Sequence, residues 1–210
     1  MDKEISKKIF LKNKIKTPKF FTHSYDKTPS SLIKIIDKKL RFPVVVKPLN
    51  EGSSVNVYIA NKKNFIKILN KLKSYKRVLI EQFIGGREIQ VAIMGNKKLG
   101  AIELKPKRKF YDYQAKYDSK AKTQHIIPVN LPKIKLNQVL NIAFKAHKII
   151  GCRGVTRSDF KYFKGNFYLL EINTQPGMTK LSLVPEIANY KGISFLKLIK
   201  WILKDASKKK

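Results

Sequence analysis

Two runs of alternating polar and apolar residues flank a short turn in the last third of the chain. The runs cover 154–160 and 167–173, and both are rich in β-branched and aromatic residues. Lys164-Gly165-Asn166 supplies turn residues between them. This pattern predicts a β-hairpin. With these three residues as the loop, Phe163 pairs with Phe167, and this pairing fixes the register of the whole hairpin.

The predicted register brings four polar side chains to one face, because residues two apart on a strand share a face. Arg157 falls opposite Asn173, and Asp159 falls opposite Glu171. The other face is expected to carry Ser158, Phe160, Leu170 and Ile172. Since two directly opposed carboxylates repel each other, a positive group should lie beside them.

Two kinds of positive group fit that place. One is Arg157, which would form a salt bridge on a solvated hairpin face. The other is Mg²⁺, a hard cation that binds carboxylate and amide oxygens, keeps water ligands and shares its remaining positions with substrate phosphates. The residues alone leave both interpretations open.

Apolar periodicity predicts the remaining elements of a mixed α and β fold. Helices are expected over 4–14, 32–40, 61–72 and 132–150, and from about 182 and 194 onward. Strands are expected over 20–22, 42–46, 77–83, 87–95 and 99–104. The segment 110–117 is expected to be a loop or a single helical turn.

Some positions carry more specific expectations. In the first helix, the apolar Ile5, Ile9 and Phe10 should face the core. The strand 87–95 should be half-buried, with Ile89, Val91 and Ile93 on one face. Asn61 should cap the helix that follows it. His147 and Cys152 are interpreted as structural residues.

A Gly-Ser-Ser loop follows the buried strand 42–46. Lys47 ends that strand, and Gly52, Ser53 and Ser54 come shortly after it. Backbone N–H groups and hydroxyls in such a loop can hold phosphate oxygens, and a lysine at a strand end can reach them as a point charge. The same residues also suit an ordinary turn.

Composition narrows the class of protein. The chain has 210 residues, 43% of them hydrophobic, which is enough for a sizeable core. No apolar run approaches the length of a membrane span, and Met1-Asp2-Lys3-Glu4 lacks a signal-peptide core. A single cysteine cannot form an internal disulfide. Together these features favour a reducing cytoplasm.

The net charge of +32 suggests an anionic partner. Nucleic acid is one candidate. However, the lysines are spread through nearly every segment, and no basic–aromatic block stands out. A nucleotide would benefit from the same electrostatic field, so nucleic-acid binding is kept as the second hypothesis.

Several motifs in order along the chain make it similar to a known family. They are Met1-Asp2-Lys3, Lys47-Pro48 with 51–55, Phe110-Tyr111-Asp112-Tyr113 with Ala115-Lys116-Tyr117, 151–154, Arg157-x-Asp159, and 171–179. As a set, they resemble the D-alanine–D-alanine ligases, which are ATP-grasp enzymes. The resemblance covers essentially the whole chain. It implies an α+β ATP-grasp fold with two subdomains, 1–86 and 87–210, and ATP between them.

The resemblance also implies a role for each matching residue. ATP would be bound by Lys3, Lys47, Gly52, Ser53, Ser54, Glu81, Glu88 and Lys116. Two Mg²⁺ ions, or Mn²⁺ in their place, would be held by Asp159, Glu171 and Asn173. Arg157 would stabilise the acyl phosphate and the tetrahedral intermediate, and Ser53 with Tyr117 would lie beside the first D-alanine. Gly177, Ser182 and Leu183 would lie around the second D-alanine.

The implied reaction makes D-alanyl-D-alanine for peptidoglycan. ATP phosphorylates one D-alanine carboxylate, and the amine of a second D-alanine attacks the acyl phosphate. Alternatives are another ATP-grasp ligase, such as the D-alanine–D-lactate type, or a basic nucleic-acid-binding protein. Family members are commonly dimers, so the resemblance also implies a homodimer, with no membrane partner.

The chain departs from the family pattern in four respects. Gln82 and Gln114 stand where lysine and glutamate are common, and Asn56 stands where glycine is usual. The family also has an N-terminal α/β domain before Met1-Asp2-Lys3. As an isolated polypeptide, this chain is therefore expected to bind ATP and Mg²⁺ but to ligate poorly.

Overall fold

The computed structural model describes residues 2–25, 31–105 and 123–208. The described residues form two compact units. The first contains 2–8, 17–25, 31–85 and Thr123, and the second contains 9–16, 86–105 and 124–208. The division into functional subdomains at Gly86 stays a prediction. The segment 110–117, with Lys116 and Tyr117, lies outside the described residues.

The first unit is built on an antiparallel sheet with the strand order β1-β4-β2-β3. Its strands are β1 (Phe20–Ser24), β2 (Val44–Pro48), β3 (Tyr58–Ala60) and β4 (Arg77–Gln82). Its helices are α1 (Lys3–Lys12, whose last four residues belong to the second unit), α2 (Leu32–Lys39), α3 (Phe65–Lys71) and the 3₁₀ turn η2 (Lys73–Tyr75).

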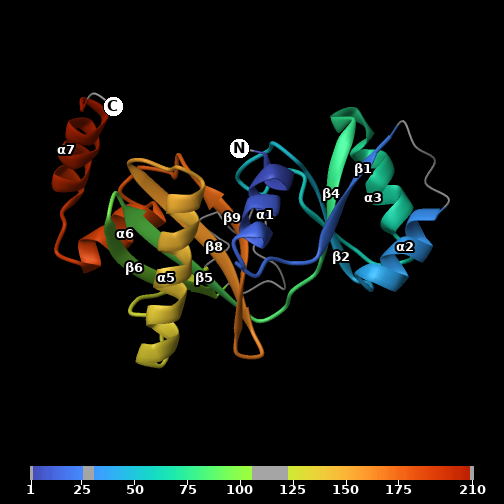
Figure 1. The fold of residues 1–210 in the computed structure, drawn as a ribbon, viewed down its shortest axis with the longest axis horizontal. Helices are drawn as coiled ribbons and strands as arrows, with labels where there is room; N and C mark the ends of the chain where they lie inside the picture. Colours follow the sequence, from blue (N-terminus) through green and yellow to red (C-terminus); the bar gives the residue numbers. More distant parts are fainter. Residues whose placement is uncertain (1, 26–30, 106–122, 209–210) are drawn as a thin grey trace. The chain divides into compact units, whose positions relative to one another are not determined.

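The two faces of this sheet have different roles. Helices α2 and α3 cover one face and share a core with alternate residues of β2 and β4, including Val44, Val46 and Ile80 (Figure 1). The residues between these positions point to the opposite face, because side chains alternate along a strand. Lys47 and Glu81 are two of those residues. Regular alternation in two short strands therefore places both side chains on one face.

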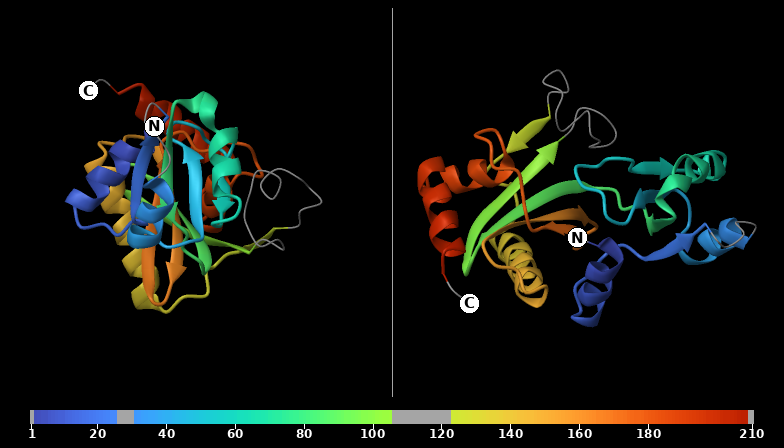
Figure 2. Two further views of the ribbon diagram at one scale, coloured as in Figure 1. Left: turned by 90° about the vertical axis from the view of Figure 1, so that its right-hand side faces the viewer. Right: turned by 90° about the horizontal axis from the view of Figure 1, so that it is seen from above.

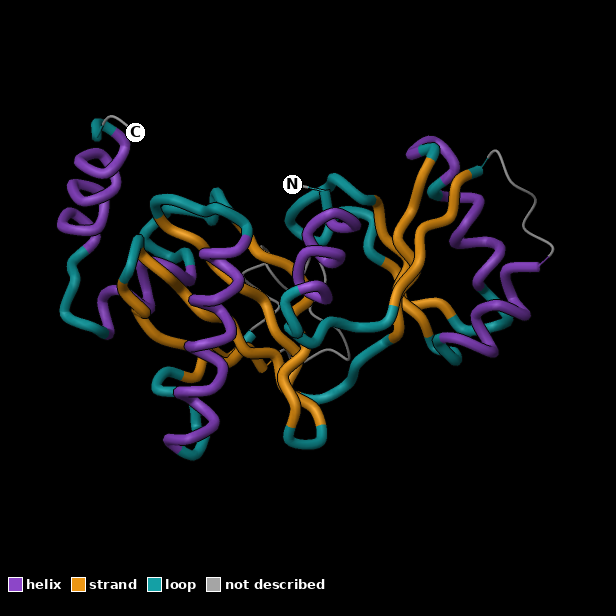
Figure 3. Tube along the Cα trace, viewed as in Figure 1, coloured by secondary structure: helices purple, strands orange, loops and turns teal. Residues whose placement is uncertain are grey.

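The second unit is an antiparallel sheet with the strand order β7-β6-β5-β8-β9. Its strands are β5 (Arg87–Met94), β6 (Lys97–Lys105), β7 (Gln124–Ile126), β8 (Val155–Phe163) and β9 (Asn166–Asn173). Its helices are α5 (Lys133–Ile149), α6 (Leu183–Tyr190) and α7 (Phe195–Ala206). Figure 3 shows this succession of helices and strands along the chain.

Helices α5 and α6 cover opposite faces of this sheet (Figure 2). The α5 side packs on Ile89, Val91 and Ile93, and the α6 side packs on the alternate residues Ala92 and Met94. Strand β5 is therefore buried on both faces, and the prediction that it is half-buried is wrong. Its central position in the sheet is the reason, because a strand covered on both sides loses its exposed face.

The predicted elements are present, with local differences. Phe10 is buried as predicted, but Ile5 is 60% exposed, and helix α1 also buries Lys3, Ser6 and Lys7. Helix α3 begins at Phe65, so Asn61 caps the turn before it by accepting from the backbone N–H of Lys63 and Asn64. Strand β2 continues through Lys47 to Pro48. Strand β7 was not predicted, because three residues give too little periodicity.

Two residues interpreted as structural have surroundings that suit this role. His147 is buried in α5, and its Nδ1 lies 2.8 Å from the Thr156 hydroxyl oxygen. Burial, with a contribution from Lys148, lowers the pKa of His147. Burial also raises the pKa of the Cys152 thiol, which favours its unreactive protonated form. Within the described part of the chain, no helix is both long and apolar enough to span a membrane.

The hairpin formed by β8 and β9 has the predicted polar pairs but a different turn. Phe163 pairs with Asn166, so the turn contains only Lys164 and Gly165. A bulge between Asp159 and Phe160 restores the predicted register beyond it, where Arg157 pairs with Asn173 and Asp159 with Glu171. Because of this shift, Leu169 enters the core in place of the predicted Leu170. A bulge can re-aim side chains in this way beside a functional site.

Candidate functional site

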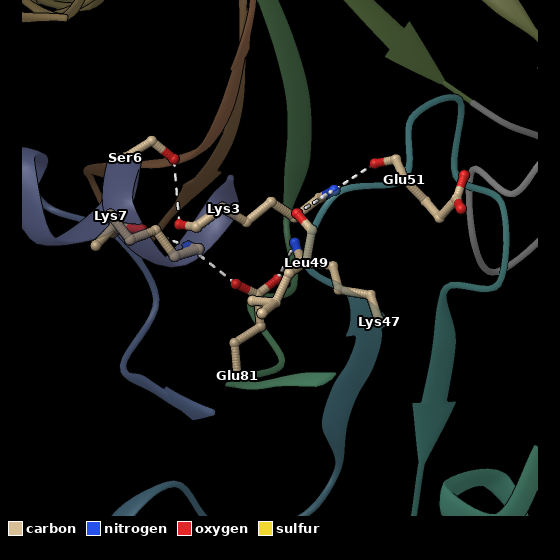
Figure 4. A network of polar contacts seen from close by, with 8 residues as sticks. Lys3, Ser6, Lys7, Lys47, Leu49, Glu51 and Glu81 are labelled. Carbon is tan, nitrogen blue, oxygen red and sulfur yellow. Dashed lines mark hydrogen bonds and ion pairs between the residues drawn. The ribbon is translucent and has the colours of Figure 1, made fainter. Parts of the chain in front are cut away.

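A buried carboxylate joins two lysines on the polar face of the first unit's sheet. Each oxygen of the Glu81 carboxylate pairs with a different lysine. Lys47 Nζ lies 2.6 Å from Oε1, and Lys7 Nζ lies 2.9 Å from Oε2. Figure 4 shows both ammonium groups approaching the carboxylate from different elements, α1 and β2. Lys7 also donates to the Thr17 hydroxyl at 2.5 Å. This network fixes the direction in which the Lys47 side chain runs.

Charge dominates the chemistry of this cluster. Burial alone would raise the pKa of Glu81, but the charges of Lys47 and Lys7 lower it below its ordinary value. The carboxylate is therefore ionised at neutral pH. Lys3 belongs to the same network through its carbonyl contacts, so three ammonium groups and one carboxylate gather here (Figure 4). Such an arrangement suits an anionic ligand.

Replacing Glu81 with glutamine should destabilise the protein by about 3–5 kcal/mol, because removing one partner of a buried ion pair leaves charge without compensation. Urea unfolding measures this change. The matched control is Asp37→Asn, which breaks the exposed pair with Lys62 and should cost less than about 1 kcal/mol. Equal losses in the two variants would contradict a structural role for the cluster.

Glu81→Gln should also change how the free energy of unfolding depends on pH under acidic conditions. Because the folded pKa of Glu81 is lowered, its contribution is present above the unfolded pKa of about 4.3 and is lost as pH falls through the folded pKa. In Glu81→Gln this part of the pH dependence should disappear. The free energy of unfolding, measured between pH 3 and pH 6, tests the sign.

Lys3 connects the lysine cluster to the loop at 50–57. Its Nζ donates to the carbonyl oxygen of Leu49 at 3.4 Å and to that of Glu51, so it lies against the chain where the loop begins (Figure 4). Gly52 and Ser53 are exposed, and Ser54 is half-buried. The structure therefore brings Lys3 and Lys47 into one cluster and leaves the Gly-Ser-Ser loop open to solvent.

The polar face of the β8–β9 hairpin lies in the second unit. The Arg157 guanidinium donates two hydrogen bonds to the Asp159 carboxylate, with Nε 2.8 Å from Oδ1 and Nη2 3.0 Å from Oδ2. Asn173 Nδ2 donates to Asp159 Oδ2 at 3.5 Å. Glu171 pairs with Asp159 across the strands. The structure thus brings together all four residues that the sequence placed on this face.

The donor set of this face fits a hard cation. It offers two opposed carboxylates and an amide whose oxygen is a further candidate ligand, and oxygen is the donor that Mg²⁺ and Mn²⁺ prefer. Over residues 2–25, 31–105 and 123–208, His, Cys, Asp and Glu form no metal-holding group of three or more. Waters and ligand phosphates would have to complete the coordination, which is usual for Mg²⁺. The same residues can therefore either form the ion pair between Arg157 and Asp159 or hold a metal ion.

Glu88 is held by two neighbours on the same face of this sheet. Lys161 Nζ lies 3.0 Å from Glu88 Oε2, and Gln90 Nε2 donates to Oε1 at 3.4 Å. Gln90 is fully buried and pairs with Asp159 in the next strand. The row of polar residues thus continues from the hairpin to Glu88. The predicted contact of Glu88 with nucleotide stays a prediction.

The last group of predicted residues precedes helix α6. Ser182 is the N-cap of α6, and its hydroxyl accepts from the Thr179 backbone N–H at 3.1 Å. A β-carbon added to Gly177 would lie 3.0 Å from Ser182 Oγ, so a larger residue there would require the Ser182 side chain to shift. Leu183 is the first residue of α6. Gly177 and Ser182 therefore lie close together, and their predicted place beside the second D-alanine stays a prediction.

Sequence reasoning missed three residues of these clusters: Lys7, Gln90 and Lys161. Lys7 could have been found, because it follows Lys3 by four residues and so shares its helix face. Gln90 and Lys161 also had a signal, since each lies two residues from a predicted site residue on its strand. The predicted residues Lys116 and Tyr117 lie outside the described part of the chain.

Comparison with known proteins gives consistent results. A family model described as "D-ala D-ala ligase C-terminus" matches residues 12–204. The D-alanine–D-alanine ligase of Pelagibacter ubique is 70% identical over 207 residues, which are 99% of this chain and 68% of that protein. That of Wolbachia pipientis wMel is 40% identical over 211 residues, covering 98% of this chain and 65% of that protein.

Solved structures show the same fold. A D-alanine–D-alanine ligase from Bacillus anthracis superposes with a TM-score of 0.85 and 35% identity over 98% of this chain and 66% of that chain. Its complex with ATP gives a TM-score of 0.80 at 30% identity and 65% coverage of that chain. This chain thus spans about two thirds of the length of these relatives.

Proposed function

Because this chain belongs to the family of D-alanine–D-alanine ligase C-terminal domains, with the ATP-grasp fold, we propose that it is the ATP-binding and catalytic part of such a ligase. The proposed reaction joins two D-alanine molecules for peptidoglycan synthesis. A carboxylate of one D-alanine takes a phosphoryl group from ATP, and the amine of the second displaces phosphate. The proposal places the protein in the cytoplasm, and a homodimer stays a prediction.

In the first unit, the lysine cluster would neutralise nucleotide phosphates. Phosphoryl transfer depends mainly on positioning and charge stabilisation. Lys47 is held by Glu81, and Lys3 lies against the start of the Gly-Ser-Ser loop. Both ammonium groups are therefore oriented before a ligand arrives, which reduces the cost of ordering them on binding.

In the second unit, Asp159, Glu171 and Asn173 would hold Mg²⁺, and this cation would supply charge neutralisation at the transferred phosphoryl group. Arg157, which hydrogen-bonds to Asp159, would face the reacting carboxyl. Attack on an acyl phosphate builds negative charge on oxygen, which a guanidinium can stabilise. Gly177, Ser182 and Leu183 would line the position of the second D-alanine.

The observation that carries the proposal is the hairpin face. Its pairs of Arg157 with Asn173 and Asp159 with Glu171 put one arginine and three oxygen donors together, as metal-assisted phosphoryl transfer requires. This arrangement occurs in a chain that is 70% identical to a D-alanine–D-alanine ligase. The +32 charge keeps nucleic acid as the second candidate.

Release of ADP from ATP tests the proposed reaction. The purified protein is incubated with Mg²⁺ and ATP, and with D-alanine or L-alanine. ADP release should require D-alanine, and mass spectrometry should detect D-alanyl-D-alanine, formed slowly because this chain is expected to ligate poorly as an isolated polypeptide. ADP release that requires a different acid or amine would instead identify another ATP-grasp ligase. Binding of duplex DNA with steep salt dependence, together with no nucleotide binding, would favour the nucleic-acid alternative.

A further inference from the structure

Two consecutive tight turns shape the loop at 52–57. The Gly52 carbonyl accepts from the Val55 N–H at 3.0 Å, and the two residues between them, Ser53 and Ser54, have φ angles of 51° and 60°. Positive φ at both central positions is typical of a type I′ turn. The next turn joins the Ser54 carbonyl to the Val57 N–H at 3.4 Å.

The second turn places Asn56 at its third position, with a φ of 55°. A positive φ at that position alone is the pattern of a type II turn, which favours glycine or asparagine. Three residues with side chains thus adopt the left-handed conformation within four positions. This conformation is unfavourable for L-residues and persists where the surrounding structure holds it. The loop should therefore have an anchor.

The side chain of Asn56 supplies that anchor. Its Nδ2 donates to Tyr75 Oη at 2.7 Å, and its Oδ1 accepts from Tyr58 Oη at 3.1 Å. Tyr75 is the last residue of the 3₁₀ turn η2, and Tyr58 is the first residue of β3. Both ends of the amide are therefore bonded to side chains that regular structure holds in place.

We propose that Asn56, Tyr58 and Tyr75 are positioning residues that hold the loop 52–57 in a phosphate-binding conformation before nucleotide arrives. The proposal rests on the proposed function, in which the Gly-Ser-Ser loop contacts ATP phosphates. The three side chains act through the loop and do not touch the reacting atoms. They should therefore affect the affinity for ATP, because a preformed loop binds without an ordering cost, and leave the chemical step unchanged.

Three variants remove the anchor in stages. Tyr75→Phe and Tyr58→Phe each remove one hydrogen bond and should raise the KM for ATP about threefold to tenfold. Asn56→Gly removes both bonds while permitting the positive φ, and it should raise KM more than either single variant. In all three, kcat should stay within about twofold of the wild-type value.

Tyr25→Phe is the matched control, because it also removes a tyrosine hydrogen bond within the first unit. Tyr25 Oη donates to the Leu69 carbonyl at 2.5 Å. Its loss should lower thermal stability without changing the KM for ATP. If Tyr25→Phe raised KM as much as Tyr75→Phe, the effect would be general destabilisation, and the proposal would be overturned.

Hydrogen exchange of the nucleotide-free protein gives a readout that is independent of catalysis. The amides of 52–57 should exchange faster in Tyr75→Phe, Tyr58→Phe and Asn56→Gly than in the wild type, and Tyr25→Phe should leave them unchanged. Unchanged exchange in all three anchor variants would overturn the proposal. A wild-type protein that binds no nucleotide would overturn the proposed function, while exchange would still decide whether these side chains hold the loop.

Discussion

Replacing Glu171 with glutamine is expected to abolish the Mg²⁺ dependence of nucleotide binding and to lower kcat/KM at least about 100-fold. A carboxylate that holds a cation beside transferred phosphate contributes several kcal/mol to the stabilisation of charge, and each 1.36 kcal/mol is tenfold in rate. Glutamine retains the shape of the side chain but loses its charge, so it should bind Mg²⁺ poorly.

The same substitution should not unfold the protein. Glu171 and Asp159 pair directly across β8 and β9, and two opposed carboxylates repel each other. Glutamine keeps the size of the side chain and its place in the strand pair, so the fold should stay largely intact and the melting temperature should stay close to the wild-type value. The two hydrogen bonds from Arg157 to Asp159 do not involve the Glu171 side chain.

Calorimetric titration of ATP with and without Mg²⁺, together with a thermal melt, checks both expectations. Glu186→Gln is the matched control, because it neutralises another carboxylate of the second unit, which pairs with His125. It should bind nucleotide as the wild type does. If Glu171→Gln kept the wild-type Mg²⁺ dependence, the hairpin face would be only a salt-bridged surface.

Lys47→Met should weaken ATP binding about 30-fold to 100-fold. A hydrogen bond between charged groups contributes about 1.5–3 kcal/mol, and Lys47 is buried and directed by Glu81. The protein should remain folded, since Lys7 still pairs with Glu81 and methionine suits a buried site.

The control for this variant is Lys62→Met, which removes the same charge from the same unit. Lys62 is exposed and pairs with Asp37, so its loss should change ATP affinity less than about twofold. Equal weakening by the two variants would show that the general field of a +32 chain attracts nucleotide, and the specific role of Lys47 would be wrong.

The hairpin shows which part of the site local patterns could predict. Alternation and the assumed position of the turn were enough to pair Asp159 with Glu171, and this pairing is confirmed. The turn itself was wrong by one residue, and the bulge after Asp159 compensates for the error. The alternation pattern cannot reveal a shortened turn and a bulge whose register shifts cancel each other. Only the structure therefore shows that Leu169, and not Leu170, lies in the core.

Helix α1 shows a feature of the site that local sequence patterns did not predict. Helical periodicity placed the helix and the buried Phe10 correctly, but Ile5 is exposed and Lys7 is fully buried. A lysine can be buried when a carboxylate compensates its charge. Here that carboxylate belongs to Glu81, which is far from Lys7 in the sequence. Such long-range pairing has no local pattern, although the four-residue spacing from Lys3 was a usable hint.

The family resemblance supplied what neither periodicity nor charge could. It assigned ATP contacts to Glu81 and Glu88, and both carboxylates are paired with lysines in the structure. A carboxylate can accept several hydrogen bonds, so the lysine pairs alone do not exclude those assignments. They stay predictions that a nucleotide complex would test.

Titration of ATP into the purified chain, with Mg²⁺ and again with excess EDTA, tests the central claim most directly. The account predicts one nucleotide per chain with Mg²⁺ and at least about tenfold weaker binding without it. Equal affinity in both conditions, or no binding at moderate salt, would contradict the claim that this chain is the ATP-binding part of a D-alanine–D-alanine ligase.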